Sequence, residues 1–313
     1  MIVAITGGTG FIGRKLVLKH LANNDTVRIL TRKADHKVFG GEKYLGDIAI
    51  EHPVSEDFFC DVDVFYHCAA ELYDTSRMEQ VNVKGTSRLI ALASGRVARW
   101  VQLSSVGAYG PVQSGTVTEQ TVESPANEYE KTKTHADRLV REASVNGAFS
   151  SVILRPSNVF GTQMPNKSLC QLFSMIDRGL FFFMGPPGAS ANYVHVDDVV
   201  EALYLCGTHA GAAGHTFNVS DWSTFEQFVE TVASELEKPI PKWRIPVAPV
   251  HFAVRLLERL PRFPLTSSRI NALTTRVRYD SALIQRELGF AYGANMSERI
   301  ACLAREWKNC DRG

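Results

Sequence analysis

The sequence predicts an α/β fold in which a doubly wound parallel sheet carries helices on both faces and a smaller lobe follows. In the first 160 residues, short apolar runs alternate with amphipathic helical patterns, which is typical of a parallel sheet. A glycine-rich turn at residues 6–13 joins the first apolar run to the first helical pattern. From about Gly161 loops and prolines become frequent, but no linker is long enough to make the second half independent.

Composition limits the classes of protein and partner. The 313 residues are 45% hydrophobic, which suffices for a substantial core. Lysine and arginine number 34 against 33 acidic residues, so the net charge of +1 creates no long-range field for nucleic acid or an anionic membrane. No apolar run could span a membrane, and residues 1–5 lack the charged start of a signal peptide. Six scattered cysteines fit reduced thiols, so we expect a cytoplasmic protein without a bound metal.

The elements of the predicted sheet follow from the apolar runs and the residues that interrupt them. Asn23, Asn24 and Asp25 end the first helix, and the next strand completes a βαβ unit of about 30 residues. Pro156 closes the last strand of the first half. The predicted strands cover residues 2–6, 26–31, 62–66, 100–103 and 151–154. The predicted helices cover residues 11 to about 23, about 78–93 and about 129–143.

The second half is predicted to contain fewer and shorter elements. These are a strand and helix within residues 193–206, a strand at 216–219, a helix at 225–236 and a final helix at about 297–307. Residues 1–160 with about 193–220 are expected to form the sheet domain. Residues about 161–192 with 221–313 are expected to form the smaller lobe, and the two share one structural unit.

The glycine turn predicts a phosphate site. Gly7, Gly10 and Gly13 allow a tight turn and let the backbone approach a pyrophosphate, which the N–H groups and dipole of a helix N-terminus favour. Phe11 and Ile12 begin the helix and belong to the same turn. We therefore predict a Rossmann-type dinucleotide-binding domain with a C-terminal substrate-binding lobe. A purely structural glycine turn is the alternative.

The end of the second strand indicates which dinucleotide binds. An acidic residue there binds the ribose 2′-hydroxyl of NAD, whereas arginine accommodates the 2′-phosphate of NADP. Arg32 and Lys33 occupy this place without a carboxylate, so we predict a preference for NADP, with NAD as the second choice. Solvated surface charges are the alternative interpretation of both. Asp47 follows a predicted strand end and is expected either to accept a hydrogen bond from the adenine amino group or to cap a loop.

Tyr129 and Lys133 are the candidate acid–base pair. They are four residues apart on a predicted helix, so they lie on the same face. The ammonium of Lys133 is expected to favour the phenolate and to lower the Tyr129 pKa from about 10 toward neutrality. Two solvated residues that share this spacing by chance are the alternative.

Ser104 and Ser105 follow a predicted strand at the edge where open α/β sheets bind ligands. Tyr129 comes 129 − 105 = 24 residues after Ser105. With the glycine turn and the Tyr-x-x-x-Lys pattern, this series resembles the extended short-chain dehydrogenase/reductase family, of the NAD-dependent epimerase/dehydratase type. The resemblance extends, in the family's order, over residues 67–70, 81–86, 154–161, 193–199 and 287–290.

The resemblance implies a role for each matching residue. Tyr129 would exchange a proton with the substrate oxygen while hydride moves to or from the nicotinamide, and Ser105 would hydrogen-bond the same oxygen. Lys133 would hold the nicotinamide ribose. The other matching positions are Ala69, Asn82, Ser104 and Pro156 for the cofactor and Asn158 for the substrate. Ser104 could instead support its loop, and Asn82 could merely stabilise a helix. In this motif, His195 and Asp197 more often hold the chain where it returns into the second lobe than take part in the reaction.

Absent residues narrow the reaction. The family's 4,6-dehydratases carry Asp-Glu after the serine or threonine, and its 3,5-epimerising reductases carry a cysteine two residues on. Val106 and Gly107 occupy these places here. The expected chemistry is therefore hydride transfer at one carbinol or keto carbon, by reduction, oxidation or 4-epimerisation.

The substrate is expected to be a nucleotide sugar, although the second half departs from that pattern. Such enzymes often place a diphosphate-binding arginine where Ala191 and Asn192 stand. Arg269 and Arg276, with Arg278, are the candidate replacements, and ordinary surface charges are the alternative.

Two further functions stay open. The amphipathic segment 245–264 also resembles the branch that handles hydroxysteroids and dihydroflavonols, which favours a lipophilic alcohol as the second substrate class. A dinucleotide-sensing protein without turnover is the third function. A homodimer through the two long helices is expected only by analogy.

Overall fold

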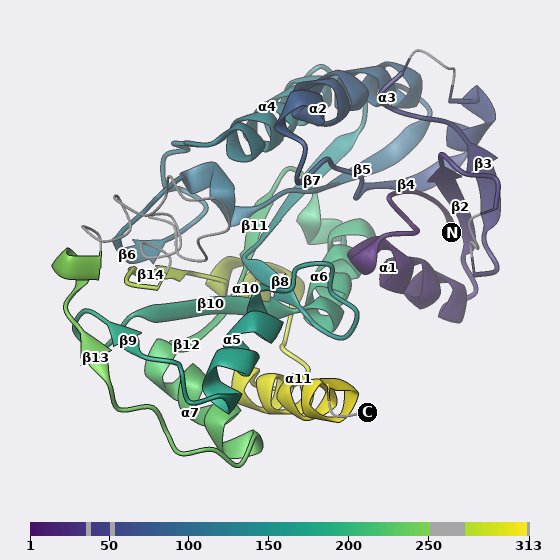
Figure 1. Cartoon of the computed structure of the whole chain (residues 1–313). Coiled ribbons are helices and arrows are strands. Elements are labelled where there is room, and N and C mark those ends of the chain that lie inside the picture. The colour runs from purple at the N-terminus through teal and green to yellow at the C-terminus, as the bar shows by residue number, and fades with distance from the viewer. Residues whose placement is uncertain (36–38, 51–53, 251–272, 312–313) are drawn as a thin grey trace.

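The computed structural model describes residues 1–35, 39–50, 54–250 and 273–311 and is built around a seven-stranded sheet. All neighbouring strands are parallel, in the order β11-β7-β5-β4-β1-β2-β3, which confirms the doubly wound fold (Figure 1). The strands are β1 (Ile2–Thr6), β2 (Thr26–Thr31), β3 (Glu42–Leu45), β4 (Val62–His67), β5 (Val97–Leu103), β7 (Ser150–Pro156) and β11 (Thr216–Val219). Strand β5 begins three residues before its predicted start. These residues were not predicted because Arg99 interrupts the apolar run; its guanidinium donates to the carbonyls of Gly207 and His209.

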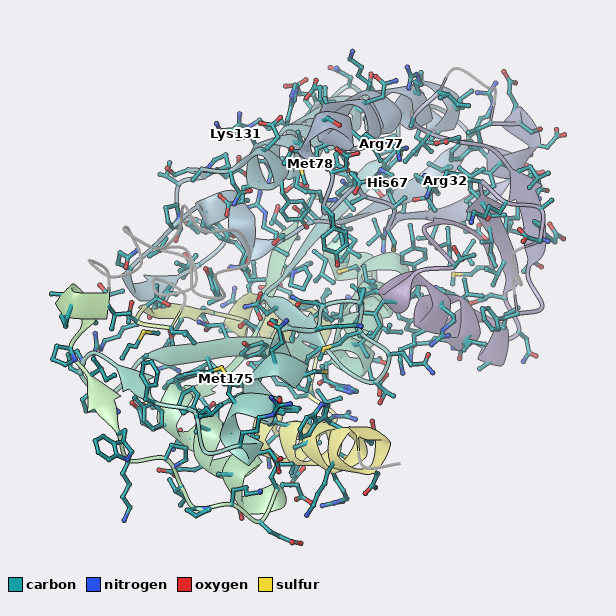
Figure 2. All side chains as sticks on the ribbon, in the orientation of Figure 1. Arg32, His67, Arg77, Met78, Lys131 and Met175 are labelled. Atoms are coloured by element: carbon teal, nitrogen blue, oxygen red, sulfur yellow. The ribbon has the colours of Figure 1, made fainter. Side chains whose placement is uncertain are left out.

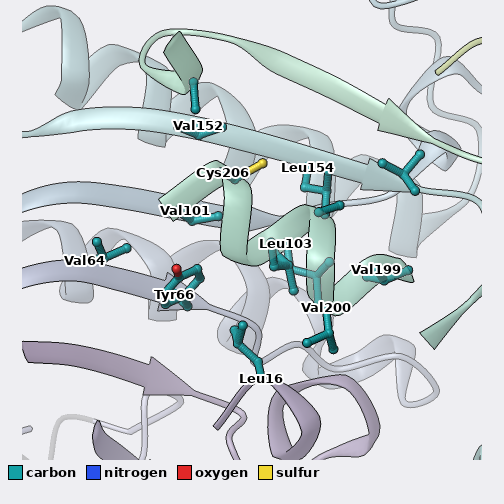
Figure 3. Packing of buried hydrophobic residues seen from close by; sticks show 14 of the residues in the cluster. Leu16, Val64, Tyr66, Val101, Leu103, Val152, Leu154, Val199, Val200 and Cys206 are labelled. Atoms are coloured by element: carbon teal, nitrogen blue, oxygen red, sulfur yellow. The ribbon is translucent and has the colours of Figure 1, made fainter. Parts of the chain in front are cut away.

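Helices cover both faces of this sheet (Figure 1). Helices α1 (Phe11–Ala22) and α6 (Val196–Thr208) lie on one face, and α3 (Gly85–Ala93) and α4 (Glu128–Val145) lie on the other. Figure 3 shows α6 packed on the sheet, where Val199, Val200 and Cys206 meet side chains of the central strands. The strands contribute side chains to the packing against both helix layers, because successive side chains of a strand point to opposite faces.

The predicted helix at 78–93 is three consecutive pieces. These are α2 (Thr75–Met78), the π-helical turn η2 (Glu79–Lys84) and α3. The predicted helical segment is therefore present and starts three residues earlier, at Thr75, but a π-turn interrupts it. The π-turn carries Asn82, a predicted site residue.

Helix α4 carries the Tyr-x-x-x-Lys pattern and has a well-defined start. Asn127 and Glu130 form a capping box, in which each side chain accepts a hydrogen bond from the other residue's backbone N–H. This cap satisfies two of the helix's unpaired N–H groups and so places Tyr129 in the first turn of the helix.

The second lobe contains short strands and three longer helices. Its strands are β8 (Asn158–Phe160), β9 (Phe183–Met184), β10 (Ser190–His195), β12 (Asp221–Thr224) and β13 (Arg244–Ile245). Its helices are α5 (Ser168–Asp177), α7 (Phe225–Glu235) and α11 (Met296–Asp311). Strands β6 (Ser114–Val117) and β14 (Arg276–Tyr279) pair with each other, and α10 (Ala282–Leu288) follows β14. The 3₁₀ turns are η1 (Glu56–Phe59), η3 (Val106–Tyr109) and η4 (Ala210–Ala212).

Several of these strands escaped prediction because they have two to four residues and are stabilised by partners far away in sequence. Within the described residues, no helix is both long and apolar enough to cross a membrane. The five cysteines with described side chains are free thiols.

Candidate active site

The glycine turn has the shape required for close approach of a phosphate. Gly7 has φ of +68°, and the Gly10 N–H donates to the Gly7 carbonyl at 2.9 Å. A Cβ on Gly13 would lie 2.2 Å from the Gly7 carbonyl oxygen, so only glycine fits at this position. Gly10 is the N-cap of α1, no acidic residue lies in the helix's first turn, and the N-terminal N–H groups can bind an anion. The turn therefore fits a dinucleotide pyrophosphate.

Ala69 lies directly against this turn. A Cβ added to Gly7 would stand 2.8 Å from the Ala69 nitrogen, and the Ala69 N–H donates to the Thr6 hydroxyl at 3.3 Å. The ends of β1 and β4 therefore meet at the place predicted for the cofactor. A larger residue at position 7 would push these two strand ends apart.

The two residues predicted to bind the adenosine half lie at the ends of β2 and β3. Arg32 is exposed and, among the described residues, has no hydrogen-bond or ion-pair partner, so its guanidinium is available to a 2′-phosphate. Figure 2 shows it in the half of the molecule formed by the seven-stranded sheet. Asp47 accepts the Ala49 N–H at 2.9 Å, which is the loop-capping role expected as one alternative. Contact of Asp47 with adenine stays a prediction.

Ser105 and Tyr129 come together across the end of β5. The Ser105 side chain caps η3 by accepting the Gly107 N–H at 3.1 Å. The Ser105 side chain lies close enough to the Tyr129 hydroxyl to lower the phenol pKa. Burial and the charge of Asp137 act in the opposite direction and are stronger together, so the pKa of Tyr129 rises to about 12. The phenol is therefore protonated at neutral pH.

The expectation that Lys133 lowers this pKa is wrong for the observed geometry. The Lys133 ammonium donates to the Leu103 carbonyl at 2.6 Å and so points toward the end of β5. Burial lowers the pKa of Lys133, and Asp137 partly offsets this effect. The lysine is 4% exposed, behind Tyr129 in the helix. The shared helical face was predicted correctly, but the direction of the side chain depends on the tertiary structure.

A buried ion pair behind the helix was not predicted. Asp137 accepts hydrogen bonds from the Arg155 guanidinium at 3.0 and 3.4 Å and from the Ser104 hydroxyl at 2.7 Å. Ser104 thus supports the strand end, which is the alternative role, and its contact with the cofactor stays a prediction. Arg155 also pairs with Glu123. Two features of the sequence point to this pair. Arg155 interrupts the apolar run of a strand, and Asp137 lies one helical turn after Lys133.

Asn82 does not touch Lys133 in this structure. Its amide oxygen accepts the Glu71 N–H at 2.7 Å, and its amide nitrogen donates to the Glu71 carbonyl at 3.1 Å and to the Thr132 hydroxyl at 3.2 Å. Asn82 therefore joins the π-turn to α4 through Thr132, the residue before Lys133.

The residues predicted around the nicotinamide and substrate lie where β7 ends. Pro156 is buried as the last residue of β7 and pairs in register with Val219. Asn158 is exposed, and its amide donates to the Asn192 carbonyl at 3.2 Å. These residues connect the large sheet to the second lobe.

The structure gives the predicted arginines different surroundings. Arg276 donates to the carbonyls of Pro186 and Pro187 at 3.0 Å, so it fastens a loop, which argues against its predicted diphosphate role. Arg278 stacks on Trp222, with 3.8 Å from its guanidinium carbon to the ring centroid. Arg269 and most of the amphipathic segment 245–264 lie outside the described residues.

Asp197 joins the two halves, because its carboxylate pairs with the Arg299 guanidinium of α11 at 3.7 Å. The His195 side chain accepts the Asp197 N–H as the N-cap of α6, and the Asp197 carboxylate pairs with Lys15 of α1 at 2.8 Å. The structural role expected for them is therefore the one observed.

The parallel sheet with a glycine turn between β1 and α1 defines a Rossmann-type dinucleotide-binding fold. The chain belongs to the NAD dependent epimerase/dehydratase family, whose model matches residues 3–220.

Two of the proteins similar to this chain are named for nucleotide sugars. The dTDP-6-deoxy-L-talose 4-dehydrogenase (NAD(P)(+)) of Kitasatospora kifunensis is 31% identical over 67% of this chain and 71% of its own length. The UDP-glucose 4-epimerase of Vibrio cholerae is 29% identical over 78% of each chain. A short-chain dehydrogenase/reductase of Agrobacterium tumefaciens, solved with bound NAD, superposes with a TM-score of 0.77 at 21% identity, over 100% of this chain and 98% of its own.

Proposed function

We propose that this protein is an NADP-preferring oxidoreductase or epimerase that transfers hydride to or from one carbinol or keto carbon of a nucleotide sugar. The placement of Ser105 directly after β5 and of Tyr129 in the first turn of α4, at the carboxyl edge of the sheet, carries the proposal. When bound, the nicotinamide supplies or accepts the hydride. In reduction, Tyr129 gives its proton to the substrate oxygen while Ser105 hydrogen-bonds the same atom; in oxidation the proton returns.

A protonated phenol can serve as the proton donor when the reaction runs as a reduction. With a pKa of about 12, Tyr129 holds its proton at neutral pH and is a proton donor from the start. Val106 and Gly107 supply no carboxylate to the Ser105 turn. The nearby Glu130 carboxylate accepts the N–H groups of Ala126 and Asn127. Elimination around a sugar ring therefore lacks a second acid–base group in this turn.

The preference for NADP is supported by Arg32, which has no partner among the described residues. The nucleotide-sugar substrate is supported by the relatives from Kitasatospora and Vibrio. We also propose the predicted division into a sheet domain of residues 1–160 with about 193–220 and a lobe of the remainder. A homodimer and a cytoplasmic location stay predictions, and light scattering of the purified protein tests the first.

A lipophilic alcohol is the second candidate substrate. Ala191, where nucleotide-sugar enzymes often have a diphosphate-binding arginine, is buried at 3% exposure. The Asn192 amide is occupied by the Val277 carbonyl at 2.9 Å. Neither residue can bind a diphosphate, and tight binding of UDP, dTDP or GDP in calorimetry would argue against this candidate.

The decisive experiment has two stages. A screen of UDP-, dTDP- and GDP-sugars and ketosteroids for thermal stabilisation with NADPH identifies the substrate class. Turnover is then compared between the wild type and Tyr129→Phe. We expect a loss of about 100-fold or more in kcat, because general acid catalysis contributes that much, with NADPH affinity nearly unchanged. Loss of NADPH affinity or of folding instead would contradict the role of Tyr129, and a non-catalytic sensor would show no turnover in either protein. A cofactor retained through purification would indicate an epimerase.

A further inference from the structure

A chain of buried hydrogen bonds links the glycine turn to the tyrosine helix, and His67 is at its centre. His67, the last residue of β4, is 1% exposed. Its Nδ1 lies 2.6 Å from the Thr6 hydroxyl at the end of β1. Its Nε2 lies 3.0 Å from the Thr86 hydroxyl on α3. One imidazole thus bridges the cofactor strand and the helix that follows the π-turn.

The direction of these hydrogen bonds can be derived from the structure. The Thr86 hydroxyl has one hydrogen and donates it to the Asn82 carbonyl at 2.6 Å. It can therefore only accept from His67, so Nε2 must carry a hydrogen. Burial, helped by the Lys133 charge, lowers the pKa of His67 to about 3, and the ring is neutral with a single N–H. Nδ1 is then an acceptor, and the Thr6 hydroxyl donates to it.

Both ends of this chain reach residues of the candidate active site. At one end, the Thr6 hydroxyl accepts the N–H of Ala69, the residue packed against Gly7. At the other end, Asn82 donates through its side chain to the Thr132 hydroxyl at 3.2 Å. The single hydrogen of the Thr132 hydroxyl is shared between the carbonyls of Glu128 and Tyr129, at 2.9 and 3.1 Å. All donors point from the glycine turn toward the tyrosine.

We propose that His67 is a positioning residue that holds the dinucleotide turn and the Tyr129 helix at a fixed separation, and that it does so as the neutral Nε2–H tautomer. Its catalytic part rests on the proposed function, whereas the tautomer rests on the hydrogen bonds of Thr86 and on the burial that keeps the ring neutral. The glycine turn that binds the phosphates and the proton donor Tyr129 belong to separate elements. A rigid connection between these elements therefore determines whether the hydride donor and the proton donor meet at one carbon.

A packing role is the competing explanation. The His67 ring stacks on Phe65 at 6.0 Å and meets the edge of Trp100 at 5.7 Å. A histidine retained for this aromatic contact alone would tolerate either tautomer, and its replacements would affect stability without separating affinity from turnover.

The first test measures the tautomer in the intact wild-type protein. In ¹⁵N-labelled protein at pH 7, long-range ¹H–¹⁵N correlation spectra distinguish the protonated from the unprotonated ring nitrogen. The His67 signals are identified by their loss in His67→Asn or, if that variant does not fold, by their shift in Thr86→Ser. We expect a hydrogen on Nε2 only. A hydrogen on Nδ1, or on both nitrogens, would overturn the inference even if the enzyme turned over as proposed.

The second test separates the two ends of the chain with matched variants. An asparagine oxygen takes the place of Nδ1, so His67→Asn keeps the contact with Thr6 and loses the one with Thr86. A glutamine nitrogen takes the place of Nε2, so His67→Gln does the reverse. We expect His67→Asn to keep NADPH affinity within about 2-fold and to lower kcat by about 10-fold to 100-fold. His67→Gln should weaken NADPH binding more than it lowers kcat.

Control variants keep the test decisive. His135→Asn changes an exposed histidine of α4 and should alter neither quantity by more than about 2-fold. If the His67 variants do not fold, Thr86→Ser, which keeps the hydroxyl, is compared with Thr86→Val, which removes it. Only the valine variant should lower kcat, by about 10-fold or more. Equal changes in kcat and NADPH affinity for His67→Asn and His67→Gln would show a packing role. Equal changes in kcat for Thr86→Ser and Thr86→Val would show the same. An inactive wild type would contradict the proposed function and leave the tautomer to be decided by the spectra.

Discussion

Replacing Arg155 with methionine tests how strongly the buried ion pair supports the tyrosine helix. The side chains of Arg155 and Asp137 are 1% and 0% exposed, and two guanidinium nitrogens lie 3.0 and 3.4 Å from one carboxylate oxygen. Removing the arginine leaves a buried carboxylate that keeps only the Ser104 hydroxyl at 2.7 Å. The loss of one partner of such a pair costs about 3–5 kcal/mol. This is a large part of the roughly 5–15 kcal/mol that stabilises a typical domain.

Urea unfolding followed by circular dichroism measures this cost as the change in unfolding free energy. Arg305→Met is the matched control, because Arg305 pairs with Glu235 at 2.7 Å but is 59% exposed. We expect this control to lose at most about 1 kcal/mol. The double variant Arg155→Met/Asp137→Leu removes both charges and should recover most of the stability. A cost below about 1 kcal/mol for Arg155→Met, or a double variant no more stable than the single one, would refute the reasoning.

Four other predictions follow from the same geometry. Asp137→Asn removes a negative charge that raises the Tyr129 pKa, so the alkaline limb of the pH–rate profile should move to lower pH, and an upward shift would contradict this. Because burial lowers the pKa of His67 to about 3, its protonation in the unfolded state lowers stability as the pH falls below about 6.5. The stability advantage of the wild type over His67→Asn should therefore shrink by about 2 kcal/mol between pH 7.5 and 5, as urea titrations at both values will show. Gly13→Ala places a Cβ 2.2 Å from a backbone carbonyl and should abolish NADPH binding in calorimetry. Arg32→Ala should weaken NADPH binding by about 10-fold or more and leave NADH unchanged, and equal losses would remove the basis for NADP preference.

The local features of the site could be predicted because they depend on neighbours in sequence. Gly7 and Gly13 lie in a turn that only glycine can form, and the turn is recognised from their spacing and from the apolar run before it. Tyr129 and Lys133 share a helical face because four residues make about one turn. Similarly, the alternation of strands and helices was enough to predict the parallel sheet.

The direction of side chains could not be predicted in this way. Lys133 reaches the Leu103 carbonyl on β5, and the expected fall in the Tyr129 pKa is replaced by a rise. Arg276 looked available for a diphosphate, yet it donates to two carbonyls of the loop before β10. Both outcomes depend on partners that are many residues away, and no periodicity contains that information.

By itself the sequence determined the α/β class, the phosphate-binding turn, the serine and tyrosine of the candidate site and the family to which they point. Only the tertiary structure decided the environment of those groups. It placed Asp137 and Arg155 behind α4, raised the pKa of the phenol through burial, and connected the glycine turn to Tyr129 through His67. The physical reason is that turns and helices are stabilised locally, whereas pKa values and hydrogen-bond directions depend on which distant groups share a buried space.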